Sequence, residues 1–363
     1  MGVVRNVILV ALIAYFAHVI NRFVSTLGLG NVVHYHEPGP CFVVPGADEG
    51  SEDMQRLSNG IVLISSGLRF PPPGSEHTKD RVGRILKFDF NKPDVGVEEV
   101  KIINADEMHD FNPHGISIWE DKKTGEVRVF VVNHPVQDEI DYVCIFEYDV
   151  KMNTLRHLKS VSSPLFRVQN DLVATGPESF YTTLYATSRN MFVQLMEALF
   201  QLHWGAVIYY DGNDARVVDK GLFTPNGINK SPDGKFLYLA RTVHKILRVY
   251  KINSDNSITV VKDIPVGTMI DNIDVDPQNG ELWTGGHPIG YQLAQHGMDP
   301  KNGAPSQVLR IRFEGDSEFI EEVFAEPSLR AFGASIAVRY EDAMLVGTIM
   351  HKLLYCQLKH ISQ

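Results

Sequence analysis

The sequence predicts an all-β fold, a six-bladed β-propeller, and three observations support this prediction. Short runs rich in β-branched and aromatic residues are typical of strands. Turns with Pro, Asn, Asp or Gly precede them, as at Leu57–Gly60, Ser231–Lys235 and Asp276–Gly280, which indicates hairpins. Comparable units begin near residues 57, 115, 171, 227, 272 and 335, about 45 to 63 residues apart. A period near 50 residues, with several strands in each unit, is typical of propellers.

Size and charge limit the fold and its partners. The chain has 363 residues, of which 44% are hydrophobic and 21% charged, as in a globular protein with a sizeable core. The formal net charge of −10 argues against a nucleic-acid-binding surface. An acidic balance suits cation binding, and it equally suits plain solubility.

The N-terminus carries an apolar run. Residues Val7 to Ile20 are apolar apart from His18, and the run reaches the roughly 20 residues of a spanning helix only by continuing to Leu29. No small-residue cleavage signature follows it. We therefore expect a signal-anchor or uncleaved signal peptide over residues 1–29, a linker over 30–40 and the propeller over 41–363. The chain would enter the secretory pathway, with a lumenal or extracellular domain that is membrane-anchored or secreted.

One segment departs from the strand pattern. Residues 190–204 are rich in helix formers, and apolar side chains such as Phe192, Met196 and Phe200 recur at helical spacing. We expect an inserted amphipathic helix here. Its apolar stripe can pack on the propeller, or it can lie on a membrane or lipid surface or against a partner.

Two adjacent carboxylates, Glu52 and Asp53, stand in an otherwise neutral, turn-like stretch. Neighbouring side chains of an extended backbone point to opposite faces, so the pair could serve two ions, one on each side. Two solvated charges are the simpler interpretation of this stretch taken alone.

Three other stretches supply oxygen ligands near predicted strand ends: Asn170–Asp171, Asn226 and Asp271–Asn272. Calcium binds six to eight oxygens from carboxylates, amides and backbone carbonyls. Taken singly, such residues are more often turn caps. Four carboxylates gathered in one propeller channel would repel by roughly 4 kcal/mol for each close pair at an effective dielectric of 20. Bound cations are therefore the economical explanation.

Histidines form a second group. His114 and His134 bracket one predicted unit, and His287 begins a loop after another strand. A lone histidine in such a place is usually structural, whereas two beside a metal-bound carbonyl can act as a proton-transfer pair. The sequence contains no Gly-x-Ser-x-Gly elbow, His-Glu-x-x-His motif or P-loop. Asn229 begins a glycosylation sequon close to the predicted channel.

Three cysteines occur, Cys41, Cys144 and Cys356. In an oxidising compartment this number suggests one disulfide and one free thiol. A bridge from Cys41 to Cys356 would tie the two ends of a ring and close a loop of about 315 residues, worth up to roughly 5–6 kcal/mol in the chain-entropy model. Spacing alone leaves the pairing open.

These stretches together resemble the paraoxonase/arylesterase family. The matching motifs run from about Cys41 to the C-terminus, and they are Gly50–Asp53, Phe111–Ser117, Val131–Pro135, Asn170–Asp171, Asn226–Asn229, Ser231–Lys235, Asp271–Asn272 and His351–Cys356. The resemblance implies a six-bladed propeller with two calcium ions (Ca2+) in its central channel and a retained hydrophobic N-terminus.

The resemblance also implies a role for individual residues. The catalytic calcium would be held by Glu52, Asn170, Asn226, Asp271 and Asn272. The structural calcium would be held by Asp53, Asp171 and the carbonyl of Ile116. The remaining matches are a catalytic histidine dyad at His114 and His134, a pocket histidine at His287, and a ring-closing disulfide between Cys41 and Cys356.

The activity that the resemblance implies is calcium-dependent hydrolysis of small lactones and aryl esters. Two departures put the substrate preference in question. Arg69–Phe70 after Leu68 changes the expected pocket wall, and Thr183–Ala186 replaces an Asn-Asp-His run. The alternative is a non-catalytic, membrane-anchored assembly factor or chaperone for membrane proteins, favoured by the apolar N-terminus, the altered pocket and the 190–204 helix.

Overall fold

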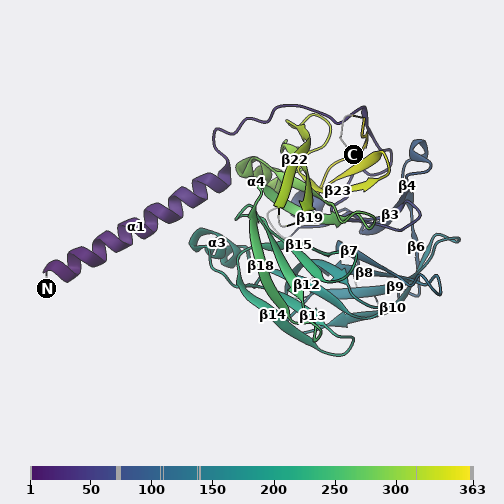
Figure 1. Cartoon of the computed structure of the whole chain (residues 1–363), viewed down its shortest axis with the longest axis horizontal. Coiled ribbons are helices and arrows are strands. Elements are labelled where there is room, and N and C mark those ends of the chain that lie inside the picture. The colour runs from purple at the N-terminus through teal and green to yellow at the C-terminus, as the bar shows by residue number, and fades with distance from the viewer. Residues whose placement is uncertain are drawn as a thin grey trace.

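The computed structural model describes residues 2–70, 75–106, 108, 110–136, 138, 140–315 and 317–359. In this part of the chain, six sheets form the body shown in Figure 1, and the predicted six-bladed propeller is confirmed. Five of the sheets have four strands and one has five.

We number the sheets as blades. Blade 1 contains β2 (Met54–Arg56), β3 (Ile61–Ser66), β4 (Arg84–Asp89) and β5 (Glu98–Glu99). Blade 2 contains β6 (Lys101–Ile103), β7 (Pro113–Glu120), β8 (Val127–Asn133), β9 (Tyr142–Asp149) and β10 (Thr154–Ser162). Blade 3 contains β11 (Val168–Ala174), β12 (Phe180–Ala186), β13 (Gly205–Tyr210) and β14 (Ala215–Leu222).

The other three blades complete the ring. Blade 4 contains β15 (Pro225–Lys230), β16 (Phe236–Arg241), β17 (Ile246–Ile252) and β18 (Ile258–Pro265). Blade 5 contains β19 (Met269–Val275), β20 (Leu282–His287), β21 (Ser306–Glu314) and β22 (Ser317–Glu326). Blade 6 contains β23 (Ala334–Tyr340), β24 (Ala343–Thr348), β25 (Leu354–Gln357) and β1 (Cys41–Val43).

The inner strands of the six blades line the channel. β2, β7, β11, β15, β19 and β23 each contact the next in that order, and β23 contacts β2. Five of the six predicted unit starts fall within these inner strands. The start near residue 57 was wrong, because Leu57–Gly60 is the turn after the inner strand β2.

Apolar clusters hold neighbouring blades together face to face. Phe88 of blade 1 shares a buried cluster with Leu345 of blade 6, and Phe130 of blade 2 shares one with Phe180 of blade 3. Because the apolar surface is buried between the blades, the channel can be lined with polar side chains.

Blade 6 combines strands from both ends of the chain. β1 pairs antiparallel with β25, with Cys41 opposite Cys356, and these two residues form a disulfide. The pairing implied by the resemblance is confirmed. Cys144 is a buried free thiol.

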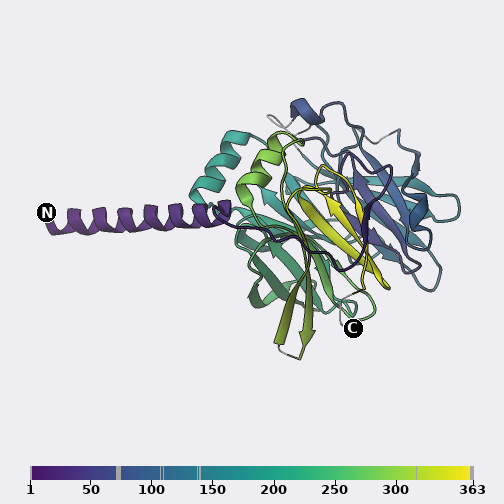
Figure 2. The same ribbon diagram turned by 90° about the horizontal axis from the view of Figure 1, so that it is seen from above.

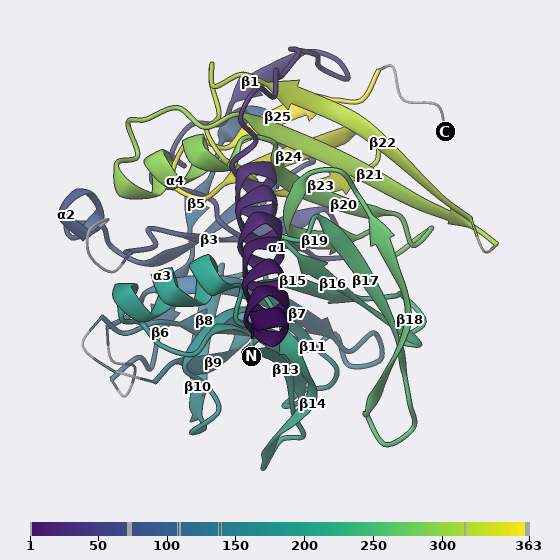
Figure 3. The same cartoon turned by 90° about the vertical axis from the view of Figure 1, so that its left-hand side faces the viewer.

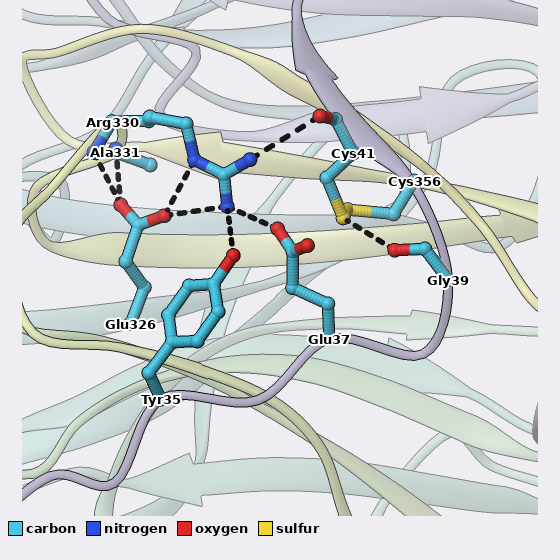
Figure 4. Close-up of a disulfide and its surroundings, with 8 residues drawn as sticks. All are labelled: Tyr35, Glu37, Gly39, Cys41, Glu326, Arg330, Ala331 and Cys356. Carbon is cyan, nitrogen blue, oxygen red and sulfur yellow. Dashed lines mark hydrogen bonds and ion pairs between the residues drawn. A yellow bond between two sulfur atoms is a disulfide. The ribbon is translucent and has the colours of Figure 1, made fainter.

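Arg330 provides a second link beside the disulfide (Figure 4). Its guanidinium donates to the Cys41 carbonyl at 3.2 Å and to Glu326 Oε2 at 2.9 Å. The same group pairs with Glu37 and lies 3.4 Å from the Tyr35 hydroxyl. The segment that leads into β1 is thus fixed to the chain that joins blades 5 and 6.

Helices occur at a few places. They are α1 (Gly2–Leu27), α2 (Ser75–Thr78), the 3-10 turn η1 (Pro93–Val95), α3 (Met191–Phe200) and α4 (Gly290–Met298). α1 extends away from the body (Figures 1 and 2) and is long and apolar enough to cross a membrane, a test that signal sequences also pass. α4 was not anticipated from the sequence.

The helix expected within residues 190–204 is present as α3. Its N-cap is Asn190, whose Oδ1 accepts hydrogen bonds from the backbone of Phe192 and Val193. The side chains of Met191, Leu195 and Leu199, which belong to the expected apolar stripe, lie outside the described part.

The C-terminal end of α1 is attached to the propeller. Lys245 Nζ donates to Ser25 O at 3.1 Å, and Asn31 Nδ2 donates to Pro288 O at 2.9 Å. Both α3 and α4 contact α1, and Figure 3 shows the three helices on one side of the ring. Pro288 directly follows His287, so α1 is anchored close to one of the candidate site residues.

Candidate functional site

Five candidate ligands, Asn170, Asp171, Asn226, Asp271 and Asn272, lie in β-bulges of the inner strands. The pairing with the second strand is interrupted at His114–Gly115 in β7, Asn170–Asp171 in β11, Asn226–Gly227 in β15 and Asp271–Asn272 in β19. A bulge releases residues from the ladder and changes the direction of their side chains. Consecutive polar residues therefore escape the strict alternation of a strand.

Neighbouring inner strands approach closely at these bulges. A Cβ added to Gly115 would lie 2.6 Å from Asp171 Cα, and one added to Gly227 would lie 2.4 Å from Asp271 O. Only glycine allows such contact between the two backbones. The approach brings polar residues of successive blades together.

Glu52 precedes β2 and connects three other blades. Its carbonyl accepts hydrogen bonds from Asn272 Nδ2 at 3.0 Å and from Ser335 Oγ at 2.6 Å. Its Oε1 accepts from Asn272 Nδ2 at 3.0 Å and lies 3.3 Å from His114 Nε2. The residue is 3% exposed, so its carboxylate depends on these contacts in place of water.

Five buried oxygens in this region have no hydrogen-bond partner among the described residues. They are Glu52 Oε2, Asn170 Oδ1, Asn226 Oδ1, Asp271 Oδ1 and Asn272 Oδ1. Each buried unsatisfied group costs about 1–3 kcal/mol, and a hard cation binds such oxygens. In the described ranges no three His, Cys, Asp or Glu side chains form a metal-binding group by themselves. The asparagine amides are therefore an integral part of this oxygen set.

Asp53 and Asp171 form a second buried carboxylate pair. Asp53 Oδ2 accepts from Ile116 N at 2.8 Å, and Asp171 Oδ2 accepts from Ile228 N at 2.7 Å, so each links two blades. Burial raises the pKa of Asp171 to about 7. Burial, with the charges of Asp171 and Glu52, also raises the pKa of Asp53. Two such carboxylates require a shared proton or a cation.

His114, whose Nε2 lies 3.3 Å from Glu52 Oε1, is hydrogen-bonded to a second histidine and through it to Asp141. His114 Nδ1 lies 2.9 Å from His134 Nε2, and His134 Nδ1 lies 2.7 Å from Asp141 Oδ1. Burial lowers the pKa of His134 more than Asp141 raises it. Burial also acts on His114, but the nearby Glu52 carboxylate raises the pKa of His114 overall.

His287 and Tyr185 lie beside Asp271. His287 Nε2 is 2.8 Å from Asp271 Oδ2. Burial and the Asp271 charge raise the pKa of Tyr185 to about 12, so this phenol stays protonated at neutral pH. His287 is the last residue of β20 and Tyr185 belongs to β12. Because both residues act on Asp271, they belong to the surroundings of the oxygen set.

The segment 68–70 is joined to the histidine pair through Asn112. Asn112 Oδ1 accepts from Arg69 N at 2.8 Å, and Asn112 Nδ2 donates to His134 O at 2.9 Å. The Arg69 guanidinium pairs with Asp110. Leu68 is buried and Phe70 is partly buried. Residues 68–70 thus lie beside the His114–His134 pair, and their one charged side chain, Arg69, is neutralised by Asp110.

Two features lie apart from the site. Asn229 Nδ2 donates to Ile273 O at 2.8 Å between blades 4 and 5, and attaching a glycan would break this bond. A cavity of about 750 Å³ is lined by Trp283, Arg339, Tyr355 and other residues, none of them a candidate site residue.

Asp141, Arg189, which pairs with Asp141, and Ser335, which donates to the Glu52 carbonyl, were not anticipated from the sequence. Asp141 follows His134 by seven residues, and a carboxylate so near a histidine pair could have been considered as an orienting group. Arg189 and Ser335 come from distant segments and belong to no motif, so only the fold brings them here.

Comparison with known proteins gives consistent matches. The arylesterase family model matches residues 33–358. The chain is 37% identical to serum paraoxonase/arylesterase 2 of Gallus gallus over 319 residues, 88% of each chain. It is 34% identical to serum paraoxonase/lactonase 3 of Oryctolagus cuniculus over 349 residues, 96% of this chain and 97% of that protein. A luciferin-regenerating enzyme shares the fold, with a TM-score of 0.54 and 10% identity over 88% of this chain and 95% of that one.

Proposed function

The chain belongs to the arylesterase family, and from that premise we propose that it is a calcium-dependent hydrolase of lactones and aryl esters. The observation that supports this most strongly is the set of five buried oxygens without hydrogen-bond partners among the described residues. All five are carboxylate or amide oxygens, which suit a hard cation, and neither a cysteine sulfur nor a histidine nitrogen is among them.

Two calcium ions are part of the proposal. The first would be held by Glu52, Asn170, Asn226, Asp271 and Asn272. The second would be held by Asp53, Asp171 and the carbonyl of Ile116, where two buried carboxylates with raised pKa values need a positive charge. A bound calcium ion supplies Lewis-acid polarisation of the ester carbonyl.

The histidine pair handles the proton in this proposal. His114 Nε2 faces the Glu52 carboxylate at 3.3 Å, and its other nitrogen is hydrogen-bonded to His134. His114 accepts a proton from the attacking water as the new carbon–oxygen bond forms. The proton then goes to the leaving alkoxide or phenoxide when the ester bond breaks. His134 supports the positive charge that His114 acquires in between.

The substrate is proposed to be small and uncharged. Leu68, Phe70 and His287 are the proposed pocket residues, and the one cation of the 68–70 segment, Arg69, is paired with Asp110. A pocket with two apolar residues and a neutralised charge suits a lactone or an aryl ester better than an anion.

The location is proposed from α1 and the disulfide. α1 would act as a signal-anchor or signal peptide, and the Cys41–Cys356 bridge suits an oxidising compartment. The propeller would then face the lumen or the extracellular side, either anchored or secreted. α1 and α3 together could contact a membrane or lipid surface.

The test is hydrolysis of phenyl acetate and δ-valerolactone by the purified protein, with calcium and after chelation. We expect both substrates to be hydrolysed with calcium, and the rate to disappear on chelation. His114→Gln should bind calcium and lose most of the rate, while the control His34→Gln, at an exposed histidine of the N-terminal segment, should match the wild type. A calcium-loaded protein that hydrolyses neither substrate would reject the proposal and favour the assembly-factor alternative.

A further inference from the structure

The hydrogen bond between His114 and His134 is continued by a second one on the far side of His134. Its acceptor is Asp141, which is 0% exposed and directly precedes β9. We propose that Asp141 is a positioning residue: it fixes the tautomers of His134 and His114 so that the lone pair of His114 Nε2 faces the site. This inference rests on the proposed hydrolase function for its catalytic meaning.

The directions of the hydrogen bonds follow from the chemistry of a carboxylate. An ionised carboxylate only accepts hydrogen bonds, so His134 must donate from Nδ1 across the 2.7 Å contact. In a neutral ring the Nε2 of His134 is then an acceptor, and His114 must donate to it from Nδ1 at 2.9 Å. His114 Nε2 is left without a hydrogen. That is the protonation state a general base requires.

Asp141 is itself held in place from two sides. Gln169 N donates to Asp141 Oδ2 at 2.6 Å, and the Arg189 guanidinium pairs with Oδ1. Arg189 also donates to the Pro135 carbonyl at 2.6 Å, in the loop that carries His134. Burial by itself would raise the pKa of Asp141. The interactions with His134 and Arg189 lower this pKa by more than burial raises it, so the carboxylate stays ionised.

The β8–β9 connection and a segment about 50 residues further along the chain meet at this carboxylate. His134 follows β8, Asp141 precedes β9 and Arg189 precedes the N-cap of α3. Buried ion pairs contribute little to stability compared with apolar packing, because both charges lose their water. A functional role for the carboxylate explains why the pair is placed beside the histidines.

The proton steps balance without any added reactant. As His114 Nε2 takes a proton from water, its Nδ1 proton can move to His134 Nε2, which places the positive charge beside Asp141. Asp141 keeps its charge and takes no proton. The same path returns the proton to the leaving oxygen. The charged groups near this path are Glu52, Asp271 and Asp171 on the His114 side and Asp141 with Arg189 on the His134 side.

The kinetic test compares Asp141→Asn with Arg189→Gln in the full-length, calcium-loaded protein. Asp141→Asn should lower kcat on phenyl acetate by about 100-fold with little change in KM, because general-base catalysis is typically worth 10²–10⁴-fold. Asp141 raises the pKa of His134 and Arg189 lowers it. The acidic limb of the kcat/KM–pH profile should therefore move to lower pH in Asp141→Asn and to higher pH in Arg189→Gln. A merely structural role would not move the limb in opposite directions.

A second readout does not depend on activity. With ¹⁵N-labelled histidine, the wild type should show His134 and His114 protonated at Nδ1 and unprotonated at Nε2, and Asp141→Asn should disturb this pattern. The matched control is Asp263→Asn, an arginine-paired carboxylate on β18, which should preserve both the pattern and the rate. Unchanged tautomers and unchanged kcat in Asp141→Asn would overturn the inference. If the wild type shows these tautomers but hydrolyses no ester or lactone, the proposed function fails while the positioning role is retained.

Discussion

Glu52 and Asp53 are neighbours in the chain, yet their carboxylates have different surroundings. Glu52 Oε2 has no hydrogen-bond partner in the described part of the chain. Both oxygens of Asp53 accept backbone hydrogen bonds, from Met54 N and Ile116 N at 2.8 Å each. The unpaired oxygen of Glu52 is free to bind a cation that takes part in the reaction. The fully hydrogen-bonded carboxylate of Asp53 suits a role in holding the blades together.

This difference predicts separate effects for the two isosteric substitutions. In the presence of calcium, Glu52→Gln should lower kcat/KM for phenyl acetate by more than about 100-fold. Mutation of residues that only support metal ligands already lowers activity or metal affinity by about 10–100-fold. Asp53→Asn should mainly lower the melting temperature, because it weakens the bond to Ile116 and removes a charge from the second site. Calorimetry and ester hydrolysis on both variants measure this. Equal losses of activity and stability in the two would contradict the division into two sites.

Chelation should make the stability of the protein depend on pH in an unusual direction. Burial raises the pKa of Asp171 to about 7, above the ordinary 3.8, so the metal-free folded state binds more protons than the unfolded state between these values. Stability therefore falls as pH rises from about 4 to about 7. Melting temperatures of the chelated protein should drop over this window, and calcium should restore them. A chelated protein that gains stability over the window would contradict this.

At the scale of the elements, the bulges of the inner strands decide where the ligands point. Turns such as Ser231–Lys235 and Asp276–Gly280 could be recognised because their residues have strong local preferences. The bulges could not, because they arise where two blades meet. Gly227 illustrates this. The residues around it in the sequence are typical of a strand, and only the closeness of Asp271 O on the next blade requires a glycine at this position.

Glycine substitution tests this interblade contact. Gly227→Ala should destabilise the protein by at least about 1–3 kcal/mol, the usual range for overpacking, and should weaken calcium binding because the new Cβ pushes on Asp271 and Asn272. Gly297→Ala in α4 is the matched control, with no atom within 4 Å of its added Cβ. It should be neutral or slightly stabilising, as expected for alanine in a helix. Equal effects of the two on calcium affinity would count against the contact.

Residue types show a similar limit to prediction. The oxygen ligands and histidines stand in short motifs, so the resemblance could identify them before the structure was known. Asp141 and Arg189 stand in no such motif, and their pairing depends on the path of the chain into α3. The link from the histidine pair to Asp141 and Arg189 therefore depends on the three-dimensional arrangement of blades 2 and 3.

At the scale of the whole molecule, the ring is closed by β1 and the disulfide. The bridge spans 315 residues, and Arg330 reinforces it through Cys41, Glu37 and Glu326. Such a closure restricts the unfolded chain as well as joining blade 6 to its first strand.

Removal of this closure should be costly. Cys356→Ser should lower the free energy of unfolding by about 2–5 kcal/mol, the usual range for loss of a native disulfide. Denaturant titration of the oxidised protein measures it. Cys144→Ala is the control, since that thiol is free and sits in a buried cluster of blade 2, and its effect should be smaller. A variant without the bridge that is as stable as the wild type would show that β-pairing and Arg330 close the ring by themselves.

The central claim, a calcium-dependent ester and lactone hydrolase, is tested most directly by returning calcium to the chelated protein. Bound calcium and the rate of phenyl acetate hydrolysis are measured in the same samples. The account predicts a rate that is absent without the ion, rises as the site formed by Glu52, Asn170, Asn226, Asp271 and Asn272 fills, and reaches a plateau at full occupancy. A rate that persists in the calcium-free protein, or one that is still absent when calcium is fully bound, would contradict it.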